Sequence, residues 1–158
     1  MKVKYLLLII CIFGSSVINA QNTFQKLFDK YDKEDDVMIV SISKSMINLI
    51  PSNINLENLN IQNLLPKLET LLIISSSNIY TKQDMSDDFK ALIEKDKNYE
   101  ELMRVREKKS SISFNVKKKG EIITELVLLV DEEKNFVAVQ ILGNFTVEDI
   151  QNISRNIR

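Results

Sequence analysis

Polar and apolar residues alternate along the last third of the chain with the two-residue period of half-buried β-strands. Ile112, Phe114 and Val116 alternate with serine, asparagine and lysine over residues 111–117, which predicts a strand with one buried and one wet face. Turns rich in lysine, glycine and acidic residues separate this strand from its neighbours. The neighbouring strands are predicted over 102–107, 121–130 and 136–142, and Gly143-Asn144 is predicted to end the sheet.

Helical spacing occurs in four other places. Phe24, Leu27, Phe28 and Tyr31 fall at i, i+3, i+4 and i+7, which predicts a helix over 23–31. Residues that favour helix starts precede three further apolar stripes. These predicted starts are Ser43, for a short helix that ends near Pro51; Ser86 with Asp87 and Asp88; and Thr146 to Asp149, which resembles a capping box.

Two short apolar runs in the first half of the chain predict buried strands. Residues 37–42 and 70–75 are uncharged and rich in β-branched or leucine side chains, as strands covered on both faces are. Residues 52–65 contain many asparagines and leucines and have no clear periodicity. The predicted fold class is α+β: a largely antiparallel sheet of about four to five strands with helices packed on it, ending in a meander and a short helix.

The strand over 121–130 is apolar on both faces, which is more than a one-sided sheet requires. Helices packed on both sides of the sheet would bury these residues. Alternatively, one face receives a partner subunit or an apolar ligand. The residues predicted to share one face are Ile122, Leu126, Leu128 and Val130, and those on the other are Ile123, Val127 and Leu129.

The first 20 residues have the pattern of a secretory signal peptide. Lys2 and Lys4 precede an apolar stretch, and Ala20 supplies a small residue for cleavage. We therefore expect residues 1–20 to be removed after Ala20, and residues 21–158 to form a single exported domain, periplasmic or envelope-associated.

Two other interpretations of this segment are less favourable. A retained membrane anchor needs about 18 nearly uninterrupted apolar residues, whereas Gly14, Ser15 and Ser16 interrupt the run early. Lipid attachment at Cys11 requires a small residue just before the cysteine, but Ile10 stands there. Lipid attachment at Cys11 is therefore not expected.

Composition excludes several chemistries from the mature domain. The chain has no histidine, and its one cysteine, Cys11, lies in the predicted leader. Cys/His and Ser/His catalysis, the usual Cys/His zinc sites and histidine-ligated haem are therefore excluded. A formal net charge of −1 is too small to indicate a nucleic-acid partner.

Two groups of residues resemble functional motifs without the context that such motifs need. Ser41 to Lys44, Ser76 to Asn78 and Lys118 to Gly120 follow the order of the penicillin-binding proteins and β-lactamases, but matches this short arise by chance in a chain rich in serine and lysine. The acidic residues Asp29, Asp32, Glu34, Asp35 and Asp36 lack the glycine and glutamate of an EF-hand, so a solvated connector is expected.

Basic residues are predicted to gather near one hairpin. Such a cluster either faces anionic lipid or polysaccharide, or forms a solvated tip that guards the sheet edge. No aromatic residues interleave with it, which disfavours nucleic acid. The residues are Arg104, Arg106, Lys108, Lys109 and Lys117 to Lys119.

Several stretches of the chain resemble the domain of unknown function 4252 family, small exported proteins of Bacteroidetes. These are the leader ending in Ala20-Gln21 and residues 24–31, 40–46, 99–103 and 125–130. The resemblance covers nearly the whole mature chain and implies export, but its motifs concern packing and turns. It therefore transfers no catalytic role to any residue. Some relatives look like lipoproteins, a pattern from which the surroundings of Cys11 depart.

These observations favour a non-enzymatic, envelope-associated module that binds a protein or an apolar ligand through its sheet. No catalytic, cofactor-binding or metal-ligating residue is assigned, and no cofactor is expected. The alternatives are a histidine-free hydrolase, which would bring two carboxylates or a Ser/Lys pair into one pocket, and a regulatory partner in envelope-stress signalling.

Overall fold

The computed structural model describes residues 23–49 and 64–154. The predicted leader with Cys11 and nearly all of residues 52–65 lie outside the described residues. The short helix predicted to run from Ser43 to near Pro51 does begin after Ser43, but it already ends at Ile47, with Asn48 as its C-cap. In the described part, no helix has both the length and the apolar character needed to cross a membrane.

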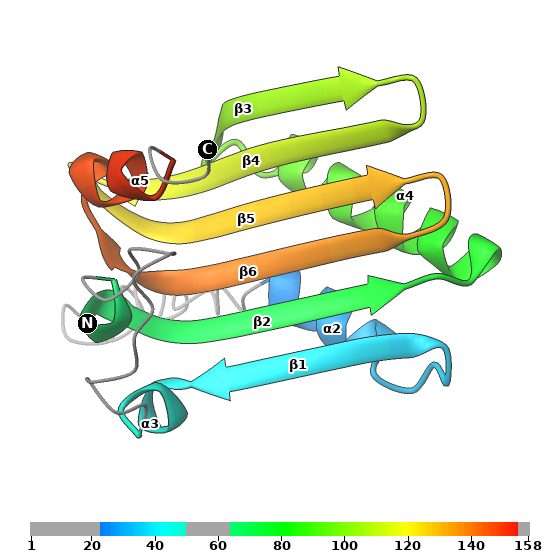
Figure 1. The fold of residues 1–158 in the computed structure, drawn as a ribbon, viewed down its shortest axis with the longest axis horizontal. Coiled ribbons are helices and arrows are strands. Elements are labelled where there is room, and N and C mark those ends of the chain that lie inside the picture. The colour runs from blue at the N-terminus through cyan, green and yellow to red at the C-terminus, as the bar shows by residue number, and fades with distance from the viewer. Residues whose placement is uncertain (1–22, 50–63, 155–158) are drawn as a thin grey trace, which may run out of the picture.

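Six strands form one antiparallel sheet in the order β1-β2-β6-β5-β4-β3 (Figure 1). The predicted α+β class is confirmed, with six strands rather than about four to five, because every predicted strand joins the same sheet. The strands are β1 (Val37–Ser43), β2 (Leu68–Ser76), β3 (Tyr99–Glu107), β4 (Ser110–Lys119), β5 (Ile122–Glu132) and β6 (Phe136–Phe145). The last four form the predicted meander, and β6 then pairs with β2.

Two strand predictions need correction. The run over 37–42 was predicted to be buried on both faces, but β1 is an edge strand whose residues are exposed or half-buried. Gly143-Asn144 does not end the sheet, since β6 continues to Phe145. A Cβ at Gly143 would lie 2.4 Å from the carbonyl oxygen of Lys67, so a close backbone approach explains the glycine inside this strand.

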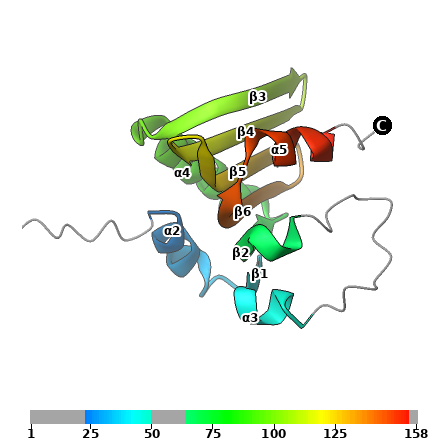
Figure 2. The ribbon, with the colours of Figure 1, turned by 90° about the vertical axis from the view of Figure 1, so that its left-hand side faces the viewer.

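The longer helices α2 and α4 cover one face of the sheet, and the short α5 lies on the other side (Figure 2). The helices are α2 (Thr23–Tyr31), α3 (Lys44–Ile47), α4 (Ile79–Lys95) and α5 (Val147–Ser154), with a 3-10 turn, η1 (Leu65–Lys67). The helix predicted over 23–31 is confirmed with the predicted bounds.

The two N-terminal caps of α4 and α5 differ in how well they were predicted. Helix α4 begins after Asn78, whose side chain accepts hydrogen bonds from the backbone N–H groups of Tyr80 and Thr81, so the predicted start at Ser86 is wrong. The capping box of α5 is confirmed: Thr146 N–H donates to Asp149 Oδ2 at 2.7 Å, and Asp149 N–H donates to Thr146 Oγ1 at 3.2 Å.

Four phenylalanines form the centre of the core between the helices and the sheet. The Phe89 ring on α4 lies 4.9 Å from Phe24, 6.3 Å from Phe28 and 5.8 Å from Phe136, measured between ring centroids. All four side chains are at most 3% exposed. Edge-to-face and tilted contacts at these separations are favourable beyond the area that they bury.

A smaller core lies on the other face, at the end of the sheet near α5. It consists of Leu64, Val116, Ile123, Leu126 and Phe145, with Ile150 of α5 packed against it. Ile123 was predicted to share a face with Val127, but the register of β5 and β6 shifts between Ile123 and Glu125. This bulge turns Ile123 to the side of Leu126.

Candidate binding surfaces and polar networks

The sheet face opposite α2 and α4 carries two rows of apolar side chains that cross all six strands. The strand registers place these residues side by side. From β1 to β3 along the strand order, the first row is Val40, Ile73, Val139, Leu128, Phe114 and Met103, and the second is Met38, Ser75, Val137, Val130, Ile112 and Val105. We call these two rows the open face; neither contains a charged residue.

The described elements cover the open face only at one end. Figure 1 looks onto this face: α2 and α4 lie behind the sheet, and α5 lies over the end where the smaller core packs. Met38, Met103 and Val105 are 57%, 50% and 42% exposed, and the other eight apolar side chains are half-buried. The strand spacings give the two rows an area of about 400 Å², which is the size of the apolar patches that often mark interaction sites.

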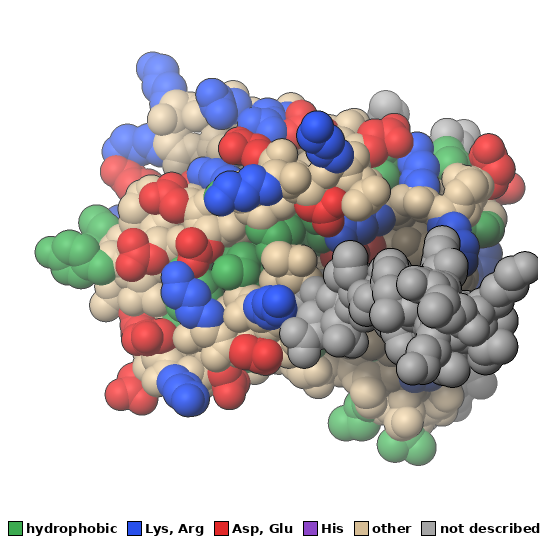
Figure 3. Space-filling model, turned by 180° about the vertical axis from the view of Figure 1, so that it is seen from behind, with side chains coloured by type: hydrophobic (Ala, Val, Ile, Leu, Met, Phe, Trp, Pro, Cys, Tyr) green, Lys and Arg blue, Asp and Glu red, His purple; other side chains and the backbone are tan. Residues whose placement is uncertain are grey.

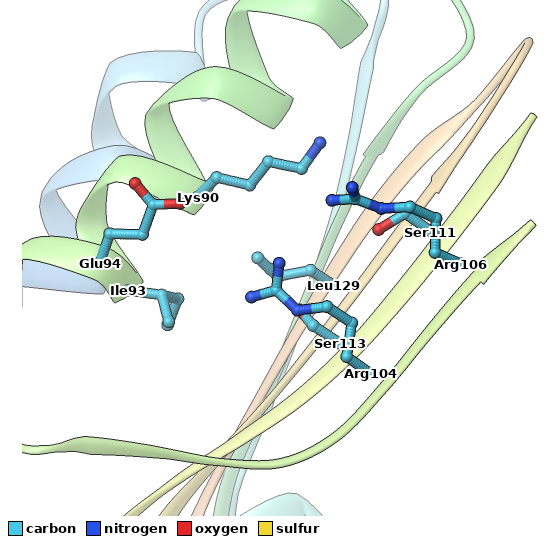
Figure 4. A pocket seen from close by; sticks show the side chains of 8 residues that line it. All are labelled: Lys90, Ile93, Glu94, Arg104, Arg106, Ser111, Ser113 and Leu129. Atoms are coloured by element: carbon cyan, nitrogen blue, oxygen red, sulfur yellow. The ribbon is translucent and has the colours of Figure 1, made fainter.

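A basic-walled cleft lies on the opposite side of the sheet, between α4 and the strands β3 and β4. Its volume is about 110 Å³. Figure 4 shows Lys90 reaching in from α4 and Arg104 and Arg106 from β3, with Leu129 on the floor. Because Arg104 and Arg106 are two residues apart on one strand, their side chains leave the same face.

Most of the positive charge in this cleft is already compensated. Arg104 donates hydrogen bonds to the carboxylate of Glu101, which raises the pKa of Arg104. Lys90 forms an ion pair with Asp131 at 2.6 Å, and Glu94 also lines the cleft. Acidic and basic side chains are intermixed over this side of the molecule (Figure 3). The cleft is therefore a polar groove of nearly balanced charge.

The predicted basic cluster does not gather at one hairpin. Lys108 and Lys109 lie in the β3–β4 turn, with Arg106 and Arg104 further along β3, whereas 117–119 lies at the other end of β4. Along this ten-residue strand the turn lysines and 117–119 are about 25–30 Å apart. Lys118 is also paired with Glu100 at 2.7 Å, so the second group is part of a different surface.

Asp131, near the end of β5, is the centre of a network with one serine and two lysines of α4. Its carboxylate accepts from Ser86 Oγ at 2.7 Å, from Lys82 Nζ at 2.9 Å and from Lys90 Nζ at 2.6 Å. Burial alone would raise the pKa of Asp131, but these three donors lower it to about 2. The carboxylate is thus held ionised, and Lys82, which is 6% exposed, keeps a charged partner.

In this network a serine, a lysine and a carboxylate approach each other. Ser86 is 0% exposed, and its hydroxyl donates to the carboxylate of Asp131. A serine nucleophile needs access to its substrate. The buried Ser86 has no such access, and its hydrogen bond ties α4 to the end of β5.

Glu125 is the centre of a second buried network. Its Oε1 atom accepts from Tyr99 Oη at 2.6 Å and from Gln140 Nε2 at 2.5 Å. Lys117 lies between Asp96, at 2.8 Å, and Glu125, at 3.5 Å, with its ammonium 4.2 Å from the centre of the Tyr99 ring. Burial and the Glu125 carboxylate raise the pKa of Tyr99, and the hydrogen bond from Lys117 lowers the pKa of Asp96.

Neither network was predicted from the sequence. For the network around Glu125, the available signal was a polar residue inside an apolar run: Gln140 within β6, and Glu125 within β5. Such residues are 0% and 7% exposed here, and buried polar groups require partners. The pairing of β5 with β6 and of β4 with β5 supplies those partners from distant parts of the chain.

The serine–lysine motifs do not meet. Ser41 is an exposed residue of β1, and Lys44 donates to the carbonyl oxygens of Pro66 and Leu68. Ser76 lies at the end of β2 beside Asp36, and β4, which carries the third motif, is separated from β2 by two strands. In the acidic connector, and in the rest of the described chain, no group of three or more potential ligands could hold a metal ion.

A family model described as a domain of unknown function (DUF4252) matches residues 31–153. The match includes the whole sheet, the helix α4 and most of α5. No curated protein and no solved structure matches the chain.

Proposed function

The chain belongs to the DUF4252 family, and we propose that it is a non-enzymatic binding module which holds a partner protein on its open face. The observation that carries this proposal is the pair of uncharged rows across six strands, of which Met38 and Met103 at the two edges are at least half exposed. Apolar surface that is left in water is a source of binding free energy, about 25 cal/mol for each Å² covered.

The shape of the open face favours a protein over a small ligand. A flat sheet touches only one side of a small apolar molecule, whereas binding pockets enclose most of the ligand surface. A second sheet or an amphipathic helix can follow the rows and exclude water along their whole length. We therefore assign the binding partner to proteins that present a complementary apolar surface.

The polar networks support a structural rather than a catalytic role for the ionisable residues. Asp131 and Glu125 each accept two or more hydrogen bonds within the fold, and Ser86 is buried. Their hydrogen bonds connect α4 with β5 and connect β3 with β5 across β4. The envelope is the proposed location, because the leader pattern and the family resemblance both favour export.

We expect Val139→Lys, at the centre of the open face, to abolish recovery of the partner. Val139 is half-buried on β6, so the lysine ammonium can reach water in the free protein but would be buried without a partner charge in the complex. The measurement is affinity purification from the native host, followed by quantitative mass spectrometry. A specific partner should fall at least about tenfold with this variant, equivalent to about 1.4 kcal/mol.

The matched control is Ser77→Lys, which places the same charge at an exposed position in the connection between β2 and α4. It should recover the partner like the unmodified chain, and both variants should keep a cooperative thermal transition. A partner recovered equally with Val139→Lys would overturn the open face as its binding site.

N-terminal sequencing of protein purified from the host tests the proposed export. We expect the chain to begin at Gln21, because cleavage after Ala20 follows the small residue that signal peptidase requires. A chain that still begins at Met1 would refute removal of the leader. A blocked, lipid-modified cysteine at position 11 would instead establish membrane anchoring.

A further inference from the structure

Among the described residues, no strand pairs with the outer edge of β1. In the sheet order β1 pairs only with β2, and Figure 1 shows no described strand beyond it, with the short α3 at its C-terminal end. Its register with β2 runs through seven consecutive pairs, from Val37 to Ser43, without a bulge. Its sequence, VMIVSIS, contains no charge and no proline. Such an edge presents a row of backbone N–H and C=O groups to another strand.

The opposite edge of the sheet is protected against such pairing. Strand β3 carries Glu100, Glu101, Arg104, Arg106 and Glu107, and its register with β4 shifts between Glu101 and Met103. Charges and bulges are the features by which natural sheets prevent edge pairing. The contrast shows that the two edges of this sheet are built for different surroundings.

We propose that the β1 edge pairs with β1 of a second copy, antiparallel and around a two-fold axis at Val40. In this register Met38 lies opposite Ile42 of the second copy, and Ile39 lies opposite Ser41. Opposed residues of an antiparallel pair point to the same face. The two open faces therefore join on one side of a sheet with six strands from each copy.

Charge and surface exposure favour a second copy in this orientation. The acidic residues Glu34, Asp35 and Asp36 precede β1, and Lys44 follows it. Antiparallel pairing brings the acidic start of one strand beside Lys44 of the other copy, whereas parallel pairing would bring the acidic starts together. Met38 and Met46, near the same edge, are 57% and 59% exposed, so this edge is accessible to a second copy.

Cross-linking at the two-fold axis tests this dimer. The test uses the full chain with Cys11→Ser, so that Val40→Cys supplies its single thiol. Directly opposed Cβ atoms in an antiparallel pair are about 4.5–5.5 Å apart, within reach of a disulfide or a short bismaleimide. Most of the protein should become a covalent dimer, and unmodified protein should show twice the chain mass by light scattering.

Val139→Cys in the same background is the matched control, because it lies on the same face but in a central strand. It should remain monomeric on the gel. Cross-linking at position 139 alone would show that copies meet face to face, and would overturn the edge dimer. Cross-linking at both positions or at neither, or a single chain mass in light scattering, would overturn it too.

Ser41→Lys provides a second test that introduces no thiol. Ser41 is exposed, and a lysine on an edge strand opposes pairing with another strand, so the variant should halve the mass in light scattering while the protein keeps a cooperative thermal transition. Loss of a different partner with an unchanged mass would indicate that the edge receives a strand of another protein, contrary to the proposal. Val139→Lys leaves β1 unchanged, so failure of the partner-binding proposal is distinguishable from failure of this one.

Discussion

Replacement of Phe89 by alanine is expected to lower the free energy of unfolding by about 3–5 kcal/mol. Phe89 is 0% exposed, and its ring contacts Phe24 and Phe28 of α2 and Phe136 of β6. The substitution removes buried apolar area and leaves a cavity where α2, α4 and the sheet meet. Urea denaturation followed by circular dichroism measures the change, which is a large part of the stability of a typical domain.

Tyr80→Ala on the same helix is the control. This side chain is 81% exposed, so its removal should change the free energy of unfolding by less than about 0.5 kcal/mol. An effect of Phe89→Ala no larger than that of the control would show that the helices do not pack on the sheet through this cluster.

Asp131→Asn is expected to have the second largest effect, a loss of about 2–3 kcal/mol at neutral pH. The amide cannot balance the charge of Lys82, whose side chain is 8% exposed, and a buried charge without its partner is costly. The value is below that for a fully buried pair because the side chain of Asp131 is 19% exposed. Glu133→Gln, at an exposed ion pair with Lys109, is the control and should change stability little.

The pH dependence of the same variant gives an independent test. The pKa of Asp131 is about 2 in the folded protein against 3.8 for the ordinary carboxyl. A lowered pKa means that the contribution is complete above about pH 4 and is lost as the pH falls toward 2. The stability difference between the unmodified chain and Asp131→Asn should therefore shrink over this range. A difference that stays constant from pH 7 to pH 2 would contradict the assigned network.

Local features of the fold were predictable because neighbouring residues determine them. The spacing of Phe24, Phe28 and Tyr31 predicts α2, and the reciprocal bonds of Thr146 and Asp149 follow from their separation of three residues. Ser86 misled the prediction because a serine followed by two aspartates also suits a helix start. Here the helical pattern already begins at Asn78, and Ser86 is satisfied by a carboxylate 45 residues away.

Long-range features were not predictable in the same way. The apolar pattern of β5 indicates that both faces of the strand need cover. It does not indicate which face the helices occupy, because that depends on how β2 pairs with β6, which is 60 residues away in the sequence. Similarly, the two lysine-containing groups are near each other in the chain, yet β4 places them at opposite ends of the sheet. Gln140 shows the same limit, since its partner Glu125 comes from the neighbouring strand.

Methionine oxidation tests the central claim, that the open face is uncovered in the isolated protein. Met38 and Met103 stand at its two edges, Met46 on α3 is 59% exposed, and Met85 in the helix-covered core is 0% exposed. Under limiting peroxide, mass spectrometry should show Met38 and Met103 oxidised about as fast as Met46, with Met85 protected. Protection of Met38 and Met103 to the level of Met85 would contradict the account, because the face would then be closed.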